Sequence, residues 1–461
     1  MRRLTVALLI ATSLAATAAF GGTWYVAPPA SGGNDTNLGT LSAPFATITK
    51  GVSKLIAPGD ILYVRTGTYA EYVTIWNKSG SSSSPIRVQA YTGESPVIDV
   101  TGVAYTGDPK AVVAIGESSY IRFDGFEVRN GPEAGIRVYN ANNVQVRWNR
   151  VHGNQKFGIV ASSASASTRG TAHTIRIEGN SVYDNVLNNS SRSASGGWTQ
   201  GIGTYRVDNA VIVDNHVYAN YGEGIDCVLT AGCTITGNTV YDNFGVNIYL
   251  DNATNALVDR NFCMAGRVAN PGNYTRSGYG ASGIATANEN YIVNGVHESN
   301  PLNNLTITNN ITVNGKFGFT YGNYEDGGGL HNTLIANNTF YGGEDMCMYI
   351  QNGSSEVHDT TTIRNNIFYA RTGQEYVYTT TTGVTWGYNN WYNGTTNTHK
   401  TGPGDVHGNP LLVNAGTDVK TDYKLTSTSP CINAGTTHSA VTTDYWGTAR
   451  GTVHDIGAHE Y

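Results

Sequence analysis

Short stretches in which apolar and polar residues alternate recur along most of the chain. Examples are the segments 121–128, 144–148 and 175–178. Alternation with a period of two buries every second side chain of a β-strand. Many of these stretches end at Asn or Gly, residues that favour tight turns and left-handed backbone. The pattern therefore predicts short strands joined by tight corners from about Ala111 to about Trp391.

One phrase repeats among these strands. It reads Asn180-Ser-Val-Tyr-Asp-Asn185, Asn215-His-Val-Tyr-Ala-Asn220 and Asn238-Thr-Val-Tyr-Asp-Asn243, and a weaker copy occupies 149–154. Self-similarity at ~20–30 residues is typical of a solenoid, and here the repeated unit consists of strands. We predict that the recurring Asn residues stand at corners and hydrogen-bond to neighbouring coils, which is a structural role.

The two ends of the chain depart from the repeat. Residues 45–56 carry apolar residues at helical spacing, which predicts a helix that covers the open end of the solenoid. The tail lacks the repeat, as a terminal cap requires. The predicted organisation is a signal peptide at 1–19, an N-terminal cap with the first coils at 20–100, a β-helix at 101–395 and a C-terminal capping segment at 396–461.

The first residues have the features of a secretion signal. Arg2 and Arg3 precede an apolar run, and Ala16-Thr17-Ala18 is a small-residue cleavage site. The apolar run is shorter than the ~20 residues that cross a bilayer, so we expect no membrane anchor. The protein is expected to be secreted, and to be a monomer because a capped solenoid needs no partner for stability.

Charge and cysteine content limit the kinds of function and the covalent links that we expect. The net charge is −6 and no basic stretch is present, so nucleic-acid binding is not expected. Export permits disulfides, and Cys227 and Cys233 are close enough in sequence to form a local bridge. The total of five cysteines leaves at least one thiol.

Distinctive segments stand at both ends of the mature chain: 38–48 and 59–71 at the start, and Ser429-Pro430, Ala434-Gly435 and Asp455-Ile-Gly-Ala458 at the end. They resemble the opening and closing motifs of secreted right-handed parallel β-helix proteins of the pectate-lyase-like superfamily. The resemblance implies an all-β fold, a right-handed parallel β-helix with a short N-terminal capping helix. It does not select a reaction, because the group includes lyases, hydrolases and binding proteins.

Aligning the coils on one buried apolar column brings a set of polar side chains together. The aligned residues are Ile202, Ile225, Ile248, Phe319 and Met348. Because side chains alternate along a strand, the residues one and three places later point outward. These positions hold Asp226 and Tyr249 in one column, and Tyr205 and Asp251 in the other. Neighbours in each column are expected to lie ~5 Å apart between coils.

Further residues flank these columns. Glu223 lies at the turn that enters the sheet, and Arg206 lies at its exit. Trp198 and Tyr205 are candidates for contact with a sugar ring, because aromatic faces stack on apolar surfaces and keep a polar edge. Acids, an arginine and aromatic rings on one exposed sheet favour a saccharide groove.

The segment Gly222-Glu-Gly-Ile-Asp226 resembles the acidic Asp-Gly-x-Asp segment of polysaccharide lyase family nine. In that family, calcium neutralises a uronate carboxylate and a lysine one coil later removes the neighbouring proton. The resemblance implies Ca²⁺ bound by Glu223 and Asp226, whose hard oxygens suit this cation. Tyr249 stands where the lysine is expected and is the predicted base. Arg206 would stabilise the enolate-like charge, and Asp251 would be a further ligand or catalytic carboxylate.

Two other functions use the same residues. A glycoside hydrolase needs two carboxyl groups, ~5 Å apart when retaining and ~6.5–9.5 Å apart when inverting, and Asp226 with Asp251, or Glu223 with Asp226, could supply them. A non-catalytic, surface glycan-binding β-helix protein would hold the sugar without making a product. The leading hypothesis is a lyase that cleaves a uronate-containing polysaccharide by calcium-assisted β-elimination.

Overall fold

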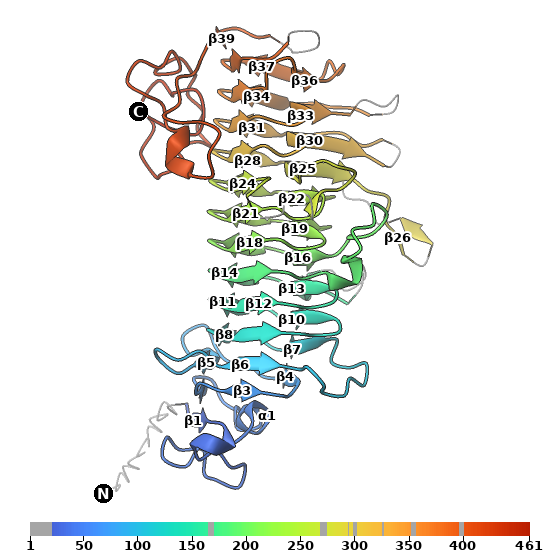
Figure 1. The fold of residues 1–461 in the computed structure, drawn as a ribbon, viewed down its shortest axis with the longest axis vertical. Helices are drawn as coiled ribbons and strands as arrows, with labels where there is room; N and C mark the ends of the chain where they lie inside the picture. The colour runs from blue at the N-terminus through green and yellow to red at the C-terminus, as the bar shows by residue number, and fades with distance from the viewer. Residues whose placement is uncertain are drawn as a thin grey trace, which may run out of the picture.

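The strands stack into a parallel β-helix, which confirms the predicted fold class (Figure 1). The computed structural model describes residues 21–164, 170–267, 274–293, 295–297, 302–324, 327–351, 356–395 and 401–461. The predicted signal peptide at 1–19 lies outside the described residues. Each coil contributes one strand to each of three parallel sheets, so strands that neighbour one another in a sheet come from successive coils.

The first sheet has 13 strands in the described chain. They are β1 (Thr23–Val26), β2 (Ile61–Val64), β5 (Ile86–Ala90), β8 (Ile121–Asp124), β11 (Gln145–Arg147), β14 (Arg176–Glu178), β17 (Val211–Val213), β20 (Thr234–Thr236), β23 (Leu257–Asp259), β28 (Thr306–Thr308), β31 (Leu334–Ala336), β34 (Thr361–Arg364) and β37 (Val384–Gly387).

The second sheet has 11 strands in the same ranges and carries the predicted site. They are β4 (Val73–Trp76), β7 (Ala111–Gly116), β10 (Ala134–Tyr139), β13 (Phe157–Ser162), β16 (Gln200–Tyr205), β19 (Glu223–Val228), β22 (Val246–Asp251), β25 (Ser282–Asn288), β30 (Phe317–Asn323), β33 (Met346–Ile350) and β36 (Glu375–Tyr378).

The third sheet again has 13 described strands. They are β3 (Thr68–Tyr69), β6 (Val97–Asp99), β9 (Glu127–Arg129), β12 (Arg150–His152), β15 (Ser181–Tyr183), β18 (His216–Tyr218), β21 (Thr239–Tyr241), β24 (Phe262–Met264), β29 (Ile311–Val313), β32 (Thr339–Tyr341), β35 (Ile367–Tyr369), β38 (Asn390–Tyr392) and β39 (Val406–His407). A separate antiparallel pair, β26 (Ile292–Val293) and β27 (Val296–His297), projects from the stack.

The core is a set of apolar columns that run along the helix axis. The predicted column is in register and fully buried, and it contains one more member, Ile284, between Ile248 and Phe319. Ile284 belongs to β25, a coil within a region that the sequence pattern did not resolve into strands. Buried aliphatic side chains of this kind contribute about 1.5–3 kcal/mol each to folding.

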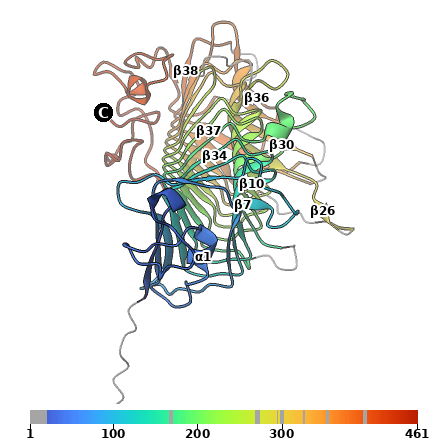
Figure 2. The ribbon, with the colours of Figure 1, turned by 60° about the horizontal axis from the view of Figure 1, so that its bottom comes forward.

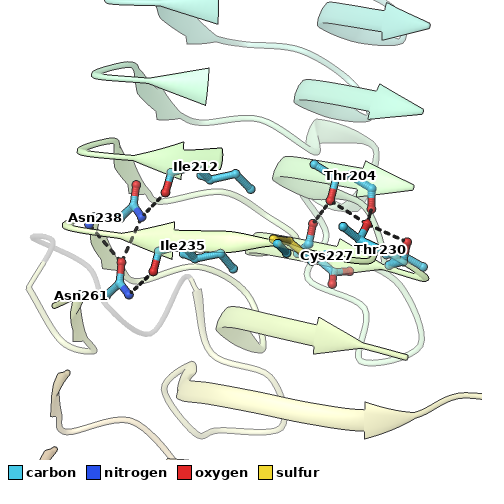
Figure 3. The surroundings of a disulfide bond; sticks show 10 residues. Thr204, Ile212, Cys227, Thr230, Ile235, Asn238 and Asn261 are labelled. Atoms are coloured by element: carbon cyan, nitrogen blue, oxygen red, sulfur yellow. Dashed lines mark hydrogen bonds between the residues drawn. A yellow bond between two sulfur atoms is a disulfide. The ribbon is translucent and has the colours of Figure 1, made fainter. Parts of the chain in front are cut away.

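The recurring asparagines form ladders at the corners, as predicted. In Figure 3, the Asn238 amide donates to Ile212 O and to Asn261 Oδ1, and Asn261 donates to Ile235 O. Each amide thus satisfies backbone groups of its own corner and of the preceding coil, where water has no access. Such rungs fix the spacing of neighbouring coils.

The predicted disulfide between Cys227 and Cys233 is present (Figure 3). It ties the C-terminal part of β19 to the residue directly before β20, across the turn between the two strands. Cys263, Cys347 and Cys431 are buried thiols.

The ends are covered by segments outside the repeat. Helix α1 (Ile48–Val52) lies at the N-terminal end of the stack, and the Thr47 side chain caps it by accepting from Lys50 N. It is shorter than the predicted 45–56, although Phe45 and Leu55 are buried as the helical pattern required. Short 3₁₀ turns occupy Pro29–Ser31, Leu187–Asn189 and Lys420–Tyr423. None of the helices in the described ranges is long and apolar enough to cross a membrane.

The C-terminal segment packs along the side of the stack, away from the side that carries β26 (Figure 2). The ring of Tyr423 contacts the rings of Phe262 and Tyr341 on the third sheet. Arg450 donates to the Asn309 side chain at 2.7 Å, and Asn337 donates to Asp455 O. The segment therefore covers the side of the later coils and leaves the second sheet uncovered.

Candidate functional site

A cleft of about 660 Å³ lies over the second sheet, on strands β16, β19, β22, β25 and β30. The register places Asp226 beside Tyr249 and Val228 beside Asp251, as the coil alignment predicted. Tyr205 lies one coil earlier in the column of Val228 and Asp251. Six of the seven predicted site residues line this cleft: Trp198, Tyr205, Glu223, Asp226, Tyr249 and Asp251.

Glu223 and Asp226 form a buried carboxyl pair at the start and middle of β19. Their exposed fractions are 4% and 1%. Gln200 on the neighbouring strand donates from Nε2 to both, at 2.9 Å to Glu223 Oε2 and 3.1 Å to Asp226 Oδ2. The Tyr205 hydroxyl donates to Gln200 Oε1 at 2.6 Å and so fixes the amide's orientation. Asp226 Oδ1 is buried without a hydrogen-bond partner.

Burial dominates the electrostatics of this pair. It raises the pKa of Asp226 well above its usual value, and the charges of Glu223 and Asp251 raise it further. Burial also raises the pKa of Glu223, although hydrogen bonding from Gln200 and the positive charge of Arg276 act in the opposite direction. Two carboxyl groups so close together do not both ionise unless a cation lies beside them. Without a cation, one of the two keeps its proton.

Tyr249 is held as a hydrogen-bond donor. Its hydroxyl donates to Glu289 Oε1 at 2.6 Å. Burial, followed by the charges of Asp251 and Glu289, raises the pKa of Tyr249 well above its ordinary value. This environment stabilises the protonated phenol and opposes the predicted role of Tyr249 as a base. The neighbouring Tyr291 hydroxyl donates to Asp251 Oδ2 in the same way.

Arg276 brings positive charge to the cleft wall. Its guanidinium stacks over the Trp198 ring, with Cζ 3.9 Å from the ring centre, and also contacts Phe244. Arg276 Nη2 donates to Gly196 O at 3.0 Å. Trp198 is 59% exposed and lines the cleft. One face of its ring packs against the Arg276 guanidinium, which keeps Arg276 in the cleft wall. No sequence pattern pointed to Arg276, because it lies in the long segment between β24 and β25.

Arg206, the seventh predicted residue, lies elsewhere. It follows β16 in a left-handed turn with φ 55° and lines a second cavity, together with Lys110 and Arg137. Arg206 is therefore absent from the lining of the cleft that holds the other six residues. The turn directs the residue after Tyr205 towards earlier coils, whereas the cleft extends over later ones.

Lys316 and Glu289 line the cleft but were not predicted as site residues. Lys316 directly precedes β30, and its Nζ lies 4.6 Å from the centre of the Tyr279 ring and 5.1 Å from that of Phe317. Glu289 directly follows β25. The sequence pattern did not show the coil that contains β25. The coils after Asp251 were therefore counted one too few.

The residues of the predicted calcium site are Glu223 and Asp226, which lie together on β19. Among the residues that the structure describes, no three His, Cys, Asp or Glu side chains converge as metal ligands. Glu223 and Asp226 nevertheless offer hard carboxylate oxygens, and the buried Asp226 Oδ1 has no hydrogen-bond partner. The pair fits a cation that takes two carboxylates from the protein and its remaining oxygen ligands from substrate and water.

Comparison with known proteins identifies similar chains. A family model described as "Pel9A-like, right handed beta helix region" matches residues 24–332. Pectate lyase PEL9 of Emericella nidulans is 34% identical over 131 residues, which are 26% of this chain and 30% of that protein. Pectate lyase L of Paenibacillus polymyxa is 29% identical over 163 residues, 34% of each chain. The matches thus span about a third of the length of these curated relatives.

Two solved structures share the fold over nearly the whole length. The crystal structure of pectate lyase Pel9A aligns with a TM-score of 0.52 at 18% identity, covering 95% of this chain and 96% of that one. The complex of XylC with xylose aligns with a TM-score of 0.64 at 13% identity, covering 95% and 98%. At these identities the likeness shows the fold alone.

Proposed function

Because this chain belongs to the Pel9A-like right-handed β-helix family, we propose that it is a secreted polysaccharide lyase that cleaves a uronate-containing polysaccharide by β-elimination. The observation that carries the proposal is the charge pattern of the cleft, where the buried pair Glu223 and Asp226 faces the same cavity as Arg276 and Lys316. Distant homology to two pectate lyases supports it. The signal-like segment 1–19 supports export.

β-Elimination requires a base and charge neutralisation at one place. The base takes the proton from the carbon that bears the uronate carboxylate. The bond between the next carbon and the glycosidic oxygen then breaks, a carbon–carbon double bond forms, and the departing oxygen takes up a proton. The negative charge that develops on the carboxylate in this step is stabilised by cations and hydrogen-bond donors fixed beside it.

Lys316 is the base in this proposal, replacing Tyr249. The Tyr249 hydroxyl donates a hydrogen bond to Glu289 and remains protonated. The Lys316 amine, in contrast, lies over aromatic rings at the cleft wall. Arg276 presents planar N–H groups that suit a carboxylate, and its stacking on Trp198 keeps the guanidinium in place. Asp251 accepts from Tyr291 and adds negative charge to the same cleft.

Calcium is the cofactor in this proposal, with Glu223 and Asp226 as its protein ligands. When bound, it would neutralise the substrate carboxylate and replace the proton that the buried pair otherwise needs. The unsatisfied Asp226 Oδ1 supports this assignment.

The test is a screen of purified protein against pectate, alginate, glucuronan and neutral polysaccharides, with calcium and with chelator. Ultraviolet absorbance of unsaturated uronate and new reducing ends are followed in parallel. We expect absorbance that requires calcium and falls about a hundredfold in Glu223→Gln. The matched control is Glu178→Gln, which makes the same change at a carboxylate paired with Arg176 on the first sheet. A folded Glu223→Gln variant with full activity would refute the assignment.

A glycoside hydrolase is the second candidate, favoured by one observation. Burial raises the pKa of Asp226 beside Glu223, and a general acid needs a carboxyl group kept protonated near neutral pH. New reducing ends without ultraviolet absorbance would select this reaction. Glycan binding without either product would select the non-catalytic alternative.

A further inference from the structure

A second cavity of about 370 Å³ lies on the same sheet as the cleft, over the earlier strands β10 and β13. Its lining includes Lys110, Arg137 and Arg206. Tyr205 lines both cavities, so they adjoin along the sheet. The proposed elimination does not use any of the three cations.

The register fixes how the two cavities are related. Arg137 pairs with Val160, Val160 with Gly203, and Gly203 with Asp226. Arg137 therefore stands in the outward column of Asp226, three coils earlier, which is roughly 14 Å at ~4.8 Å per strand. The two residues between them, Val160 and Gly203, are short. The outward side of Gly203 is covered by the hydrogen-bonded side chains of Gln200 and Tyr205, so a chain that joins the two cavities passes over Tyr205, which lines both.

The two cavities have opposite charge. In the second cavity, Lys110, Arg137 and Arg206 face one carboxylate, Glu133, whose charge is paired with Lys156 at 2.8 Å. In the cleft, four carboxyl groups outnumber two cations: the acids are Glu223, Asp226, Asp251 and Glu289. The cleft therefore repels an anionic sugar unless a bound cation or bound protons neutralise its carboxyl groups. The second cavity attracts such a sugar directly.

The geometry of Arg137 suits carboxylate binding. Its guanidinium stacks on the Tyr139 ring, with Cζ 4.6 Å from the ring centre, and the Trp76 ring stacks on Tyr139 in turn. Stacking holds the plane of the guanidinium, and a guanidinium donates from its edges. Phe157, edge-on to Tyr205, supplies an apolar wall. The side chain is therefore held in place before a ligand arrives.

We propose that this second cavity is a binding subsite for an acidic sugar of the same polysaccharide, about three coils from the bond that is cleaved. Arg137, with Lys110 and Arg206, binds a uronate carboxylate there without a metal ion. This inference rests on the proposed function for the identity of the polymer. It adds that the enzyme holds an extended acidic chain across Tyr205 and acts on polymers in preference to short oligomers.

The direct test is calorimetric binding of oligogalacturonates, long enough to span both cavities, to the full protein in EDTA. Methyl-esterified oligomers of equal length serve as the uncharged probe. We expect the acidic oligomers to bind, the esters to bind about tenfold more weakly, and Arg137→Gln to weaken acidic-oligomer binding by about tenfold. Lys110→Gln, at an exposed position, should weaken it to a smaller degree. The matched control is Arg150→Gln on the third sheet, which should bind like the wild type.

Kinetics give a second readout. Arg137→Gln should raise KM for a long acidic substrate much more than it lowers kcat, and the KM effect should shrink for oligomers too short to reach Arg137. Equal binding of acid and ester, or unchanged binding in both folded variants, would overturn the inference. Arg137-dependent acidic binding without any unsaturated product would uphold the subsite and reject the lyase, so the two failures are distinguishable.

Discussion

Asn215→Ala tests whether the asparagine ladders stabilise the coils or serve the cleft. Asn215 is buried at the corner between β17 and β18, away from the second sheet. Its Oδ1 accepts from the backbone N and the side-chain amide of Asn180, at 2.9 and 3.0 Å. Its Nδ2 donates to Ile177 O, Val213 O and Asn238 Oδ1. Alanine removes all five hydrogen bonds without straining the backbone.

The expected loss in the free energy of unfolding is about 3 kcal/mol. The buried Asn180 N–H loses its Asn215 acceptor, which costs ~1–3 kcal/mol. The void left by the carboxamide adds roughly 1 kcal/mol. Unfolding entropy is about 2.1 cal/mol/K per residue, so a chain of 461 residues changes by about 1 kcal/mol per degree, and the melting temperature should fall by about 3 °C.

The assay is thermal unfolding followed by circular dichroism, with urea titration as an independent measurement. Asn188→Ala is the matched control, because Asn188 is exposed in a 3₁₀ turn, and it should shift the melting temperature by less than about 1 °C. Asn215→Asp keeps the size but cannot donate to the carbonyl groups, so it should destabilise at least as much as alanine. An unchanged melting temperature together with lost turnover would refute the structural interpretation.

Two further predictions concern the cleft. Burial raises the folded-state pKa of Asp226, so above about pH 4 the folded protein binds more protons than the unfolded chain. In the presence of chelator, the stability of the wild type relative to Asp226→Asn should therefore fall as the pH rises above about 4. Melting temperatures of both proteins from acid to neutral pH measure this, and a constant difference would contradict it. Tyr249→Phe should keep turnover within about tenfold, because the phenol only donates to Glu289, whereas Lys316→Met should abolish it. Loss of turnover in a folded Tyr249→Phe variant, with activity retained in Lys316→Met, would restore Tyr249 as the base.

Several features followed from the sequence because they depend on local pattern. Alternation decides which side of a strand a residue faces, so the register of Asp226 with Tyr249 could be predicted from Ile225 and Ile248 alone. Each ladder asparagine follows a residue in the left-handed region, such as Asp214 or Gly237, and its amide satisfies backbone groups of the corner, so the repeated Asn made the ladders predictable. Cys227 and Cys233 are near in sequence, so the turn between them brings them together.

The tertiary structure alone decided the composition of the cleft. Strand β25, with the sequence Ser-Gly-Ile-Ala-Thr-Ala-Asn, has one large aliphatic residue, so its alternation is too weak to mark a coil. Without this coil, neither Glu289 nor Lys316 was recognised as a site residue. Arg276 reaches the cleft from an excursion between coils, and a strand pattern says nothing about where such a segment folds back. Periodicity determines which way a side chain faces, but the length and path of the excursions determine its neighbours.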